Sequence, residues 1–189
     1  MNRLRVAVIG AGHLGRIHAK LLGQVQGAEL VAVCDPNESA AKQVAAPFNV
    51  PAHTDYRDCL ASIDAAVIAA PTDFHSDIAK DCLKAGKHLL VEKPLAANGA
   101  DAKRLAMLAQ ARHLTLQVGH VERFNPAFAA VEDIRQDVKY VEAVRASRFP
   151  GRCLDVGVVM DLMIHDLDLV LSMTDAPISS VQASGVAVV

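Results

Sequence analysis

Short apolar runs alternate with amphipathic stretches from the start of the chain to about residue 120. Apolar runs bounded by turn residues predict strands, and the stretches between them have the residue spacing of helices. The predicted strands are 5–9, 30–34, 65–70, 88–91 and 114–118, and the helices predicted after the first are 38–48, 56–62, 73–85 and 99–112. This alternation predicts an α/β fold, with a doubly wound parallel sheet covered by helices on both faces. Ligands of such sheets bind beyond the carboxyl ends of the strands.

The segment 5–35 has the order of elements of a dinucleotide-binding unit. Its first strand runs into GAGHLG at 10–15, and a second strand ends at Asp35. The helix predicted between them carries on one face Leu14, Ile17, Leu21 and Leu22. A glycine-rich turn without a ligand is the alternative, but the acidic residue at the tip of the next strand favours a dinucleotide.

The three glycines of this turn have different predicted tasks. Gly10 permits the tight turn, Gly12 lets the backbone approach a pyrophosphate, and Gly15 lets the helix pack close to the strand. The N–H groups at the helix N-terminus would bind the phosphates. Asp35 would accept hydrogen bonds from the ribose 2′-hydroxyl and repel a 2′-phosphate, which predicts NAD rather than NADP.

The pattern changes beyond residue 121. The predicted elements there are a helix at 125–136, a strand at 140–149, a turn at 150–151, a strongly apolar helix at 158–173 and a strand at 178–189. Two half-buried strands and one helix rarely make a stable sheet alone. We therefore predict a Rossmann domain over residues 1–121 and a partial C-terminal domain over 122–189, for which the family resemblance given below implies a role in substrate binding or oligomerisation. The whole sequence is interpreted as a fragment of a longer protein.

Composition narrows the classes of function. The chain has 189 residues, 52% of them apolar, and its formal net charge is −2. Scattered charges and few aromatic residues argue against a nucleic-acid partner or an anionic membrane surface. The four cysteines have no metal-ligand spacing and suit buried thiols of a reducing compartment. We expect a cytoplasmic protein, with no metal, no membrane partner and a small-molecule substrate.

Lys93 lies at the carboxyl end of a predicted strand, between Glu92 and Pro94. Its ammonium would face the nicotinamide end of a bound cofactor. A lysine suits proton transfer because burial and neighbouring cations can lower its pKa. The alternative is a solvated Lys–Glu pair at a strand end.

The helix 158–173 carries one polar stripe, formed by Asp161, His165 and Asp168. Residues spaced by four and three lie on one helical face, and the rest of this helix is apolar. The stripe therefore faces either bulk water or a wet site in which His165 exchanges protons and Asp161 orients it. A zinc site is disfavoured because no Cys or second His lies at a suitable spacing.

Two further groups follow strand ends. His75, after Pro71 and Thr72, could cap a helix or line the cofactor site. His120, Arg123 and Asn125 lie in a loop that could bind an anion or a sugar, since arginine can hold a phosphate with two hydrogen bonds. The alternative for this loop is an interdomain connection in which Asn125 caps a helix. His13 and His18 have no predicted side-chain chemistry.

Taken together, GAGHLG at 10–15, Asp35, Glu92-Lys93-Pro94 and the Asp161–His165 helix resemble the Gfo/Idh/MocA oxidoreductase family. Within it, the segments 119–128 and 161–168 look most like UDP-N-acetylglucosamine 3-dehydrogenases and related UDP-sugar dehydrogenases. The resemblance implies hydride transfer with a nicotinamide cofactor, a catalytic Lys93, His165 as acid or base with Asp161 beside it, a cis Lys93–Pro94 bond, and a C-terminal domain used to form homo-oligomers.

These arguments define the expected site. The predicted cofactor-binding residues are Gly10, Gly12, His13, Leu14, Gly15, Asp35, Pro71, Thr72, His75 and Glu92. The predicted substrate-binding residues are Lys93, Arg123, Asn125, Asp161 and His165. The expected function is NAD-dependent oxidation of a sugar hydroxyl, with C3 of UDP-N-acetylglucosamine the first candidate. The alternatives are a glycosidase or lyase that retains its NAD, and a non-catalytic, truncated NAD-binding fragment.

Overall fold

A computed structural model describes residues 3–131, 138–146 and 157–186. Six parallel strands form one sheet in the order β3-β2-β1-β4-β5-β6. The strands are β1 (Leu4–Ile9), β2 (Ala28–Cys34), β3 (Ala52–His53), β4 (Ala65–Ile68), β5 (His88–Val91) and β6 (Leu116–Val118). The strand order reverses between β1 and β4, which is the arrangement of the doubly wound Rossmann fold. The predicted α/β class is confirmed.

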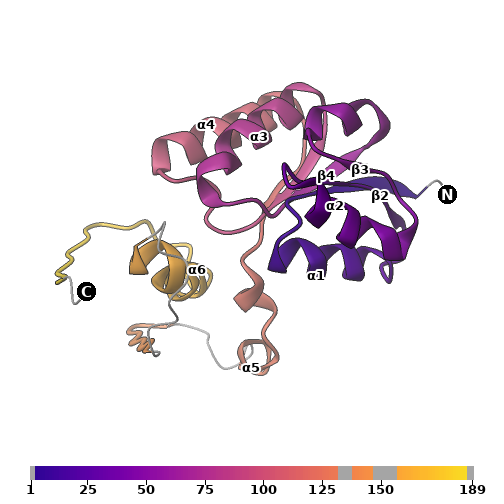
Figure 1. The fold of residues 1–189 in the computed structure, drawn as a ribbon. Helices are drawn as coiled ribbons and strands as arrows, with labels where there is room; N and C mark the ends of the chain where they lie inside the picture. Colours follow the sequence, from indigo (N-terminus) through magenta and orange to yellow (C-terminus); the bar gives the residue numbers. More distant parts are fainter. Residues whose placement is uncertain (1–2, 132–137, 147–156, 187–189) are drawn as a thin grey trace.

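Four helices cover the two faces of the sheet (Figure 1). They are α1 (His13–Leu22) and α2 (Glu38–Ala45) on one face, and α3 (Thr72–Lys84) and α4 (Gly99–Ala111) on the other. Side chains of β1 alternate between the two cores, with Val6 and Val8 in one and Ala7 and Ile9 in the other. The central strands are apolar throughout because both of their faces are buried.

The apolar side chains that α1 carries on one face are not the residues that lie closest to the sheet. Leu14, Ile17 and Leu21 are exposed to 42%, 40% and 48%, whereas Gly15 and Ala19 are buried. A Cβ atom on Gly15 would lie 1.8 Å from the Gly10 carbonyl oxygen, so the helix lies too close to the glycine turn for a larger side chain there. The small residues Gly15 and Ala19 therefore lie closest to the sheet, and of the apolar stripe only Leu22 packs against the core.

Short connections complete this part of the chain. They include the 3₁₀ helices η1 (Ala46–Phe48) and η2 (Tyr56–Ser62). Asp55 caps η2 by accepting a hydrogen bond from the Arg57 N–H. The two-residue strand β3 was not predicted, because so short a segment has no recognisable periodicity.

Residues after 120 form small helical pieces. These are η3 (Val121–Phe124), α5 (Pro126–Ala129), the π-helical turn η5 (Val159–Met163) and α6 (Ile164–Leu171). The predicted helix 125–136 is thus four residues long where it is described, and residues 132–136 lie outside the described ranges. The apolar helix at 158–173 is present as η5 and α6.

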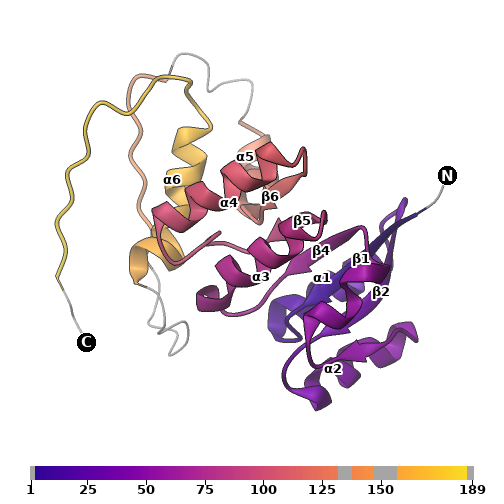
Figure 2. The ribbon, with the colours of Figure 1, turned by 90° about the horizontal axis from the view of Figure 1, so that it is seen from above.

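The two strands predicted in this part are not observed. Residues 140–146 and 178–186 have no regular secondary structure, while 147–149, the predicted turn at 150–151, and 187–189 lie outside the described ranges. In Figure 2 the C-terminal trace runs at the edge of the molecule, away from the sheet. A strand requires a neighbour to share its backbone hydrogen bonds, and alternation of side chains alone does not supply one.

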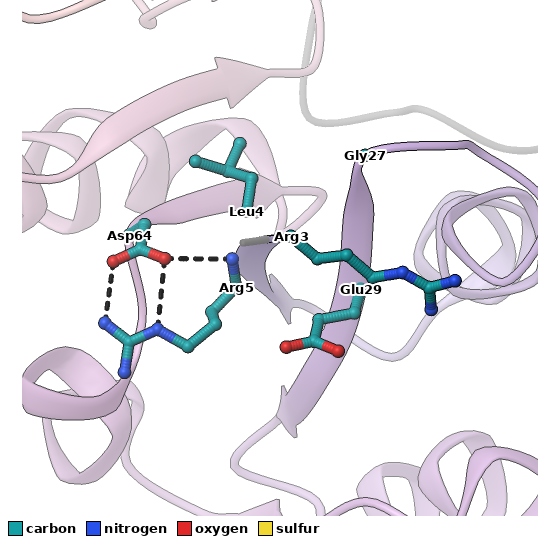
Figure 3. Close-up of a pocket in the computed structure, with 6 residues that line it drawn as sticks. All are labelled: Arg3, Leu4, Arg5, Gly27, Glu29 and Asp64. Atoms are coloured by element: carbon teal, nitrogen blue, oxygen red, sulfur yellow. Dashed lines mark hydrogen bonds and ion pairs between the residues drawn. The ribbon is translucent and has the colours of Figure 1, made fainter. Parts of the chain in front are cut away.

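A hollow of about 680 Å³ lies at the amino ends of β1 and β2, where Arg5 forms paired hydrogen bonds with Asp64 (Figure 3). This hollow lies at the amino ends of the strands, whereas the glycine turn lies at their carboxyl ends. Sheets of this kind bind ligands at the carboxyl ends of their strands. No helix within the described ranges is long and apolar enough to cross a membrane.

Candidate active site

The glycine turn between β1 and α1 has the shape that a dinucleotide requires. Gly10 has a φ of +103°, and a Cβ there would lie 2.5 Å from the Ala69 backbone at the end of β4. Gly15 likewise has no space for a Cβ atom, as described above. A Cβ on Gly12, in contrast, would meet nothing within 4 Å. The open position is therefore the one at which a pyrophosphate would approach the backbone, beside the N-terminus of α1.

Asp35 is anchored beside this turn. Its Oδ2 accepts a hydrogen bond of 2.8 Å from the Ala11 N–H, and its Oδ1 accepts one of 2.8 Å from the Asn37 N–H. The carboxylate of Asp35 thus has a defined orientation at the carboxyl end of β2, next to the place where a ribose would lie. The glycine turn and Asp35 together fit a nicotinamide dinucleotide.

Lys93 and Asp161, 68 residues apart, meet beyond the carboxyl end of β5. The Lys93 Nζ donates to the Asp161 carbonyl oxygen at 2.9 Å and to its Oδ1 at 3.0 Å. Both side chains are mostly buried, so this ion pair is less screened than a surface pair. The structure therefore brings together two of the predicted site residues, and the Lys93–Pro94 bond is cis, as predicted.

The residues on either side of Lys93, Glu92 and Pro94, each contact a histidine of a neighbouring helix. Glu92 is 7% exposed, and its Oε1 lies 2.6 Å from Nε2 of His18 on α1. The backbone carbonyl of Pro94 lies 2.8 Å from Nδ1 of His75 on α3. Three consecutive residues are thus bound by α1, η5 and α3. The sequence had indicated no side-chain role for His18, because its partner is 74 residues away.

His165 lies on α6, close enough to Lys93 for their charges to interact. Its pKa is lowered, first by burial and then by the positive charges of Lys93 and Arg145. Its Nδ1 is buried and has no hydrogen-bond partner among the described residues. A largely neutral imidazole with an unused nitrogen beside Lys93 can accept or donate a proton near neutral pH.

The loop after β6 is fastened to α6. Arg123 donates from Nε and Nη2 to the two carboxylate oxygens of Asp168, each at 2.7 Å, and His120 Nε2 lies 3.9 Å from Asp168 Oδ1. Burial opposes ionisation of Asp168, but Arg123 and His120 lower its pKa overall. Two of the guanidinium N–H groups of Arg123 are therefore occupied by a protein carboxylate.

Asn125 caps α5 by accepting a hydrogen bond from the Ala127 N–H, and its amide nitrogen donates to Glu122. This is the alternative role considered for Asn125. Arg145, which the sequence pattern did not mark, forms paired hydrogen bonds with Asp166 at 2.8–3.1 Å. Its effect on His165 could be found only once the chain was folded, because 20 residues of sequence separate the two.

Three other predictions concern residues near this edge. Thr72 is 8% exposed and Pro71 precedes it at the start of α3, next to the end of β4 that packs on the glycine turn. His75 is 1% exposed and both ring nitrogens lie against backbone carbonyls, so its ring does not line a cofactor site. His13 and Leu14 begin α1, with the Leu14 side chain exposed.

The cysteines do not contribute to the site. Cys34, Cys59 and Cys82 are buried free thiols, and burial raises the pKa of Cys82 to about 12. Cys153 lies outside the described residues. Among residues 3–131, 138–146 and 157–186, no three His, Cys, Asp or Glu side chains are grouped so that they could hold a metal ion.

Comparison with known proteins decides the family. Residues 4–120 match the Gfo/Idh/MocA model, described as an oxidoreductase family with an NAD-binding Rossmann fold. The chain belongs to this family. The relatives that the chain matches include proteins named as dehydrogenases, one of them with NAD(+) in its name.

Three relatives illustrate the likeness. The UDP-N-acetylglucosamine 3-dehydrogenase of Acidithiobacillus ferrooxidans is 42% identical over 100% of this chain and 60% of its own length. Its solved structure superposes with a TM-score of 0.91 over 100% of this chain and 62% of that one. The scyllo-inositol 2-dehydrogenase (NAD(+)) of Bacillus subtilis is 32% identical over 97% of this chain and 58% of its own.

The third relative was solved with its cofactor. GenD2 from gentamicin A biosynthesis, in complex with NAD, is 27% identical and has a TM-score of 0.80 over 92% of this chain and 54% of its own. The chain therefore spans about 60% of the length of the first curated relative it matches, and a similar share of the others.

Proposed function

We propose that this protein oxidises a hydroxyl of a UDP-sugar, with C3 of UDP-N-acetylglucosamine as the first candidate, and uses NAD as hydride acceptor. The observation that carries the proposal is the meeting of Lys93, Asp161 and His165 beyond the strand ends, on the side of the glycine turn. The named activity of the Acidithiobacillus relative, at 42% identity, supports the choice of substrate.

When bound along the glycine turn and Asp35, NAD would supply the acceptor for a hydride from the carbinol carbon. The protein's own task is to remove the hydroxyl proton, so that the C–H electron pair leaves as hydride while the C=O bond forms. Either Lys93 or His165 is the base. Asp161 keeps the Lys93 ammonium oriented, and the lowered pKa of His165 keeps its imidazole able to accept a proton.

The residues proposed to contact NAD are the backbone of 10–15 and the carboxylate of Asp35, together with the start of α3. Arg123 and Asn125 are proposed to border the sugar nucleotide. Since Arg123 is already paired with Asp168, a phosphate would have to use its remaining N–H groups.

Oxidation of an inositol hydroxyl is the second candidate, because the Bacillus scyllo-inositol dehydrogenase is 32% identical over nearly the whole chain. The chemistry at the carbinol carbon would be the same. The two substrates differ in the nucleotide, which inositol lacks, so the difference would be made by residues that bind a diphosphate.

We also propose that residues 122–189 are the first part of a second domain, and that a chain of the relatives' length forms a homo-oligomer. The exposed valines at 181 and 186, 79% and 86% exposed, support a further layer over this segment.

NADH formation by a panel of substrates tests the proposal. The panel contains UDP-N-acetylglucosamine, UDP-glucose, scyllo-inositol and myo-inositol, each with NAD, for the 189-residue chain and for a chain extended to the relatives' length. We expect the extended chain to produce NADH with UDP-N-acetylglucosamine and its Lys93→Met variant to produce none above background. NADH formation with inositols alone would replace the first candidate by the second.

A further inference from the structure

His75 occupies an unusual position for a histidine. It lies in the first turn of α3 and is 1% exposed. Its Nδ1 is 2.8 Å from the backbone oxygen of Pro94, and its Nε2 is 2.8 Å from the backbone oxygen of Ala70. The ring therefore bridges two segments, the end of β4 and the turn that follows β5.

Both partners of this ring are acceptors. A carbonyl oxygen has no proton to give, and a neutral imidazole carries an N–H on only one of its two nitrogens. In either neutral tautomer one ring nitrogen would point a lone pair at an oxygen 2.8 Å away. Only the doubly protonated ring satisfies both contacts. A buried charge is costly, but two charge-assisted hydrogen bonds to carbonyl dipoles offset that cost.

We infer that His75 is a positioning residue: a buried imidazolium that donates to Ala70 and Pro94 and so holds the backbone of the turn that carries Lys93. The positioning role rests on the proposed function of Lys93, whereas the protonation of the ring does not. His75 touches neither substrate nor cofactor in this proposal.

The neighbouring contacts show what His75 adds. Asp161 orients the tip of the Lys93 side chain, and His18 holds the carboxylate of Glu92. His75 instead contacts the backbone directly after Lys93. Through its second contact, to Ala70, it fixes the position of that backbone relative to the end of β4, which packs on Gly10 of the glycine turn. The position of Lys93 relative to the glycine turn sets the distance between the reacting carbon and the base. A displacement of the base by about 1 Å costs on the order of a hundredfold in rate.

Nitrogen NMR of the histidine side chains tests the protonation directly. In the wild-type chain labelled with ¹⁵N-histidine at neutral pH, we expect one residue to show two protonated-type ring nitrogens and two slowly exchanging N–H protons. The signals are assigned by their loss in His75→Gln. One protonated and one unprotonated nitrogen for His75 would overturn the inference, whatever the enzyme's activity.

Two substitutions test the positioning role in the active, extended chain. His75→Phe keeps the ring volume and removes both donors, and His75→Gln keeps an amide that can donate. We expect His75→Phe to lower kcat by about tenfold or more with little change in KM or in the Kd of NAD, and His75→Gln to recover part of that loss. His53→Phe, at the edge strand β3, is the matched control and should be unchanged.

The outcomes separate the two hypotheses. If His75→Phe retains wild-type kcat, the positioning role is wrong even where NMR finds the doubly protonated ring. If His75→Phe does not fold, the wild-type NMR result and the kcat of His75→Gln still decide. If the wild-type protein oxidises no member of the substrate panel, the proposed function fails, while the NMR result stands by itself.

Discussion

Residues 3–119 and the described residues of 120–186 are stabilised in different ways. In the first region the strands lie between two apolar cores, and Val8, Val33 and Ile68 are completely buried. In the second, no described residue is fully buried, and Val144 and Ile178 are 84% and 65% exposed. Both regions have a regular pattern of apolar residues. Only in the first do the described apolar side chains pack together into buried cores.

One ion pair crosses between the two regions, from Lys93 of the first to Asp161 of the second. Two further ion pairs lie within the second region and tie α6 to other segments of it: Asp168 binds Arg123 and Asp166 binds Arg145. Such pairs orient groups well but stabilise little when exposed. The comparison teaches that the first region supplies a rigid sheet and Lys93, while the second supplies Asp161 and His165, and that the Lys93–Asp161 ion pair holds the two parts of the site together at the border.

The largest expected effect is in the glycine turn of the first region. Gly15→Ala places a Cβ 1.8 Å from the Gly10 carbonyl oxygen, so we expect a loss on the order of 3–5 kcal/mol in the free energy of unfolding. Gly12→Ala is the matched control, because it meets nothing within 4 Å.

For Gly12→Ala we expect a stability change within about 1 kcal/mol, since this residue is the N-cap of α1. NAD affinity should nevertheless fall about tenfold or more, equal to about 1.4 kcal/mol, because the methyl group occupies the phosphate approach. Urea unfolding and NAD titration measure the two effects. Equal stabilities of the two variants would contradict the assignment of the closed and open positions.

The next effect is at the border between the regions. Lys93→Met in the extended chain should lower turnover by about a hundredfold or more while leaving the Kd of NAD nearly unchanged. Steady-state kinetics and NAD titration separate the two quantities. Near-normal turnover would remove Lys93 from the mechanism and leave His165 as the base.

The preference for NAD over NADP is expected to depend on Asp35, a residue of the first region. A 2′-phosphate placed about 4 Å from the Asp35 carboxylate is repelled by about 4 kcal/mol at an effective dielectric constant of about 20, and by less in salt. Half of that value still corresponds to more than tenfold in affinity. We expect NADH to bind more tightly than NADPH, and Asp35→Ser to narrow the difference. Tighter binding of NADPH to the wild type would refute the assignment.

A smaller effect concerns the charges around His165 in the second region. Its pKa is lowered by burial, then by Lys93 and Arg145, so the folded form takes up a proton less readily than the unfolded chain. As the pH falls below the ordinary value of 6.5, the unfolded chain gains this proton first, and the stability contributed by neutral His165 decreases. Arg145→Met should raise the pKa of His165, which an NMR titration measures. An unchanged or lower pKa would contradict the proximity of Arg145.

The smallest effect is expected from the ion pair at the surface of the loop after β6. The Arg123 side chain is 47% exposed, so Arg123→Met should change the global free energy of unfolding by less than about 1 kcal/mol. Hydrogen exchange should become faster in α6 and stay unchanged in β1. Faster exchange in both would show that the two regions unfold as one unit.

Much of the first region was predictable because its signals are local. Strand and helix periodicity, the GAGHLG turn and the acid at Asp35 each need only neighbouring residues, and the structure has them at the predicted places. The meeting of Lys93 with Asp161 was expected from the family resemblance and from the polar stripe on the otherwise apolar helix 158–173. The leucine spacing of α1 predicted a helix, but it did not show which residues pack closest to the sheet, because that closeness depends on Gly15.

The sequence by itself determined the fold class, the glycine turn and the identity of the groups that can carry protons, because these follow from residue type and short spacing. Only the tertiary structure decided which groups pair. The partners of His18, His75, Arg123 and Arg145 lie 74, 19, 45 and 21 residues away, and no periodicity encodes such contacts. The same holds for segments 140–146 and 178–186, which have the alternation of strands but no neighbouring strand among the described residues to accept their hydrogen bonds.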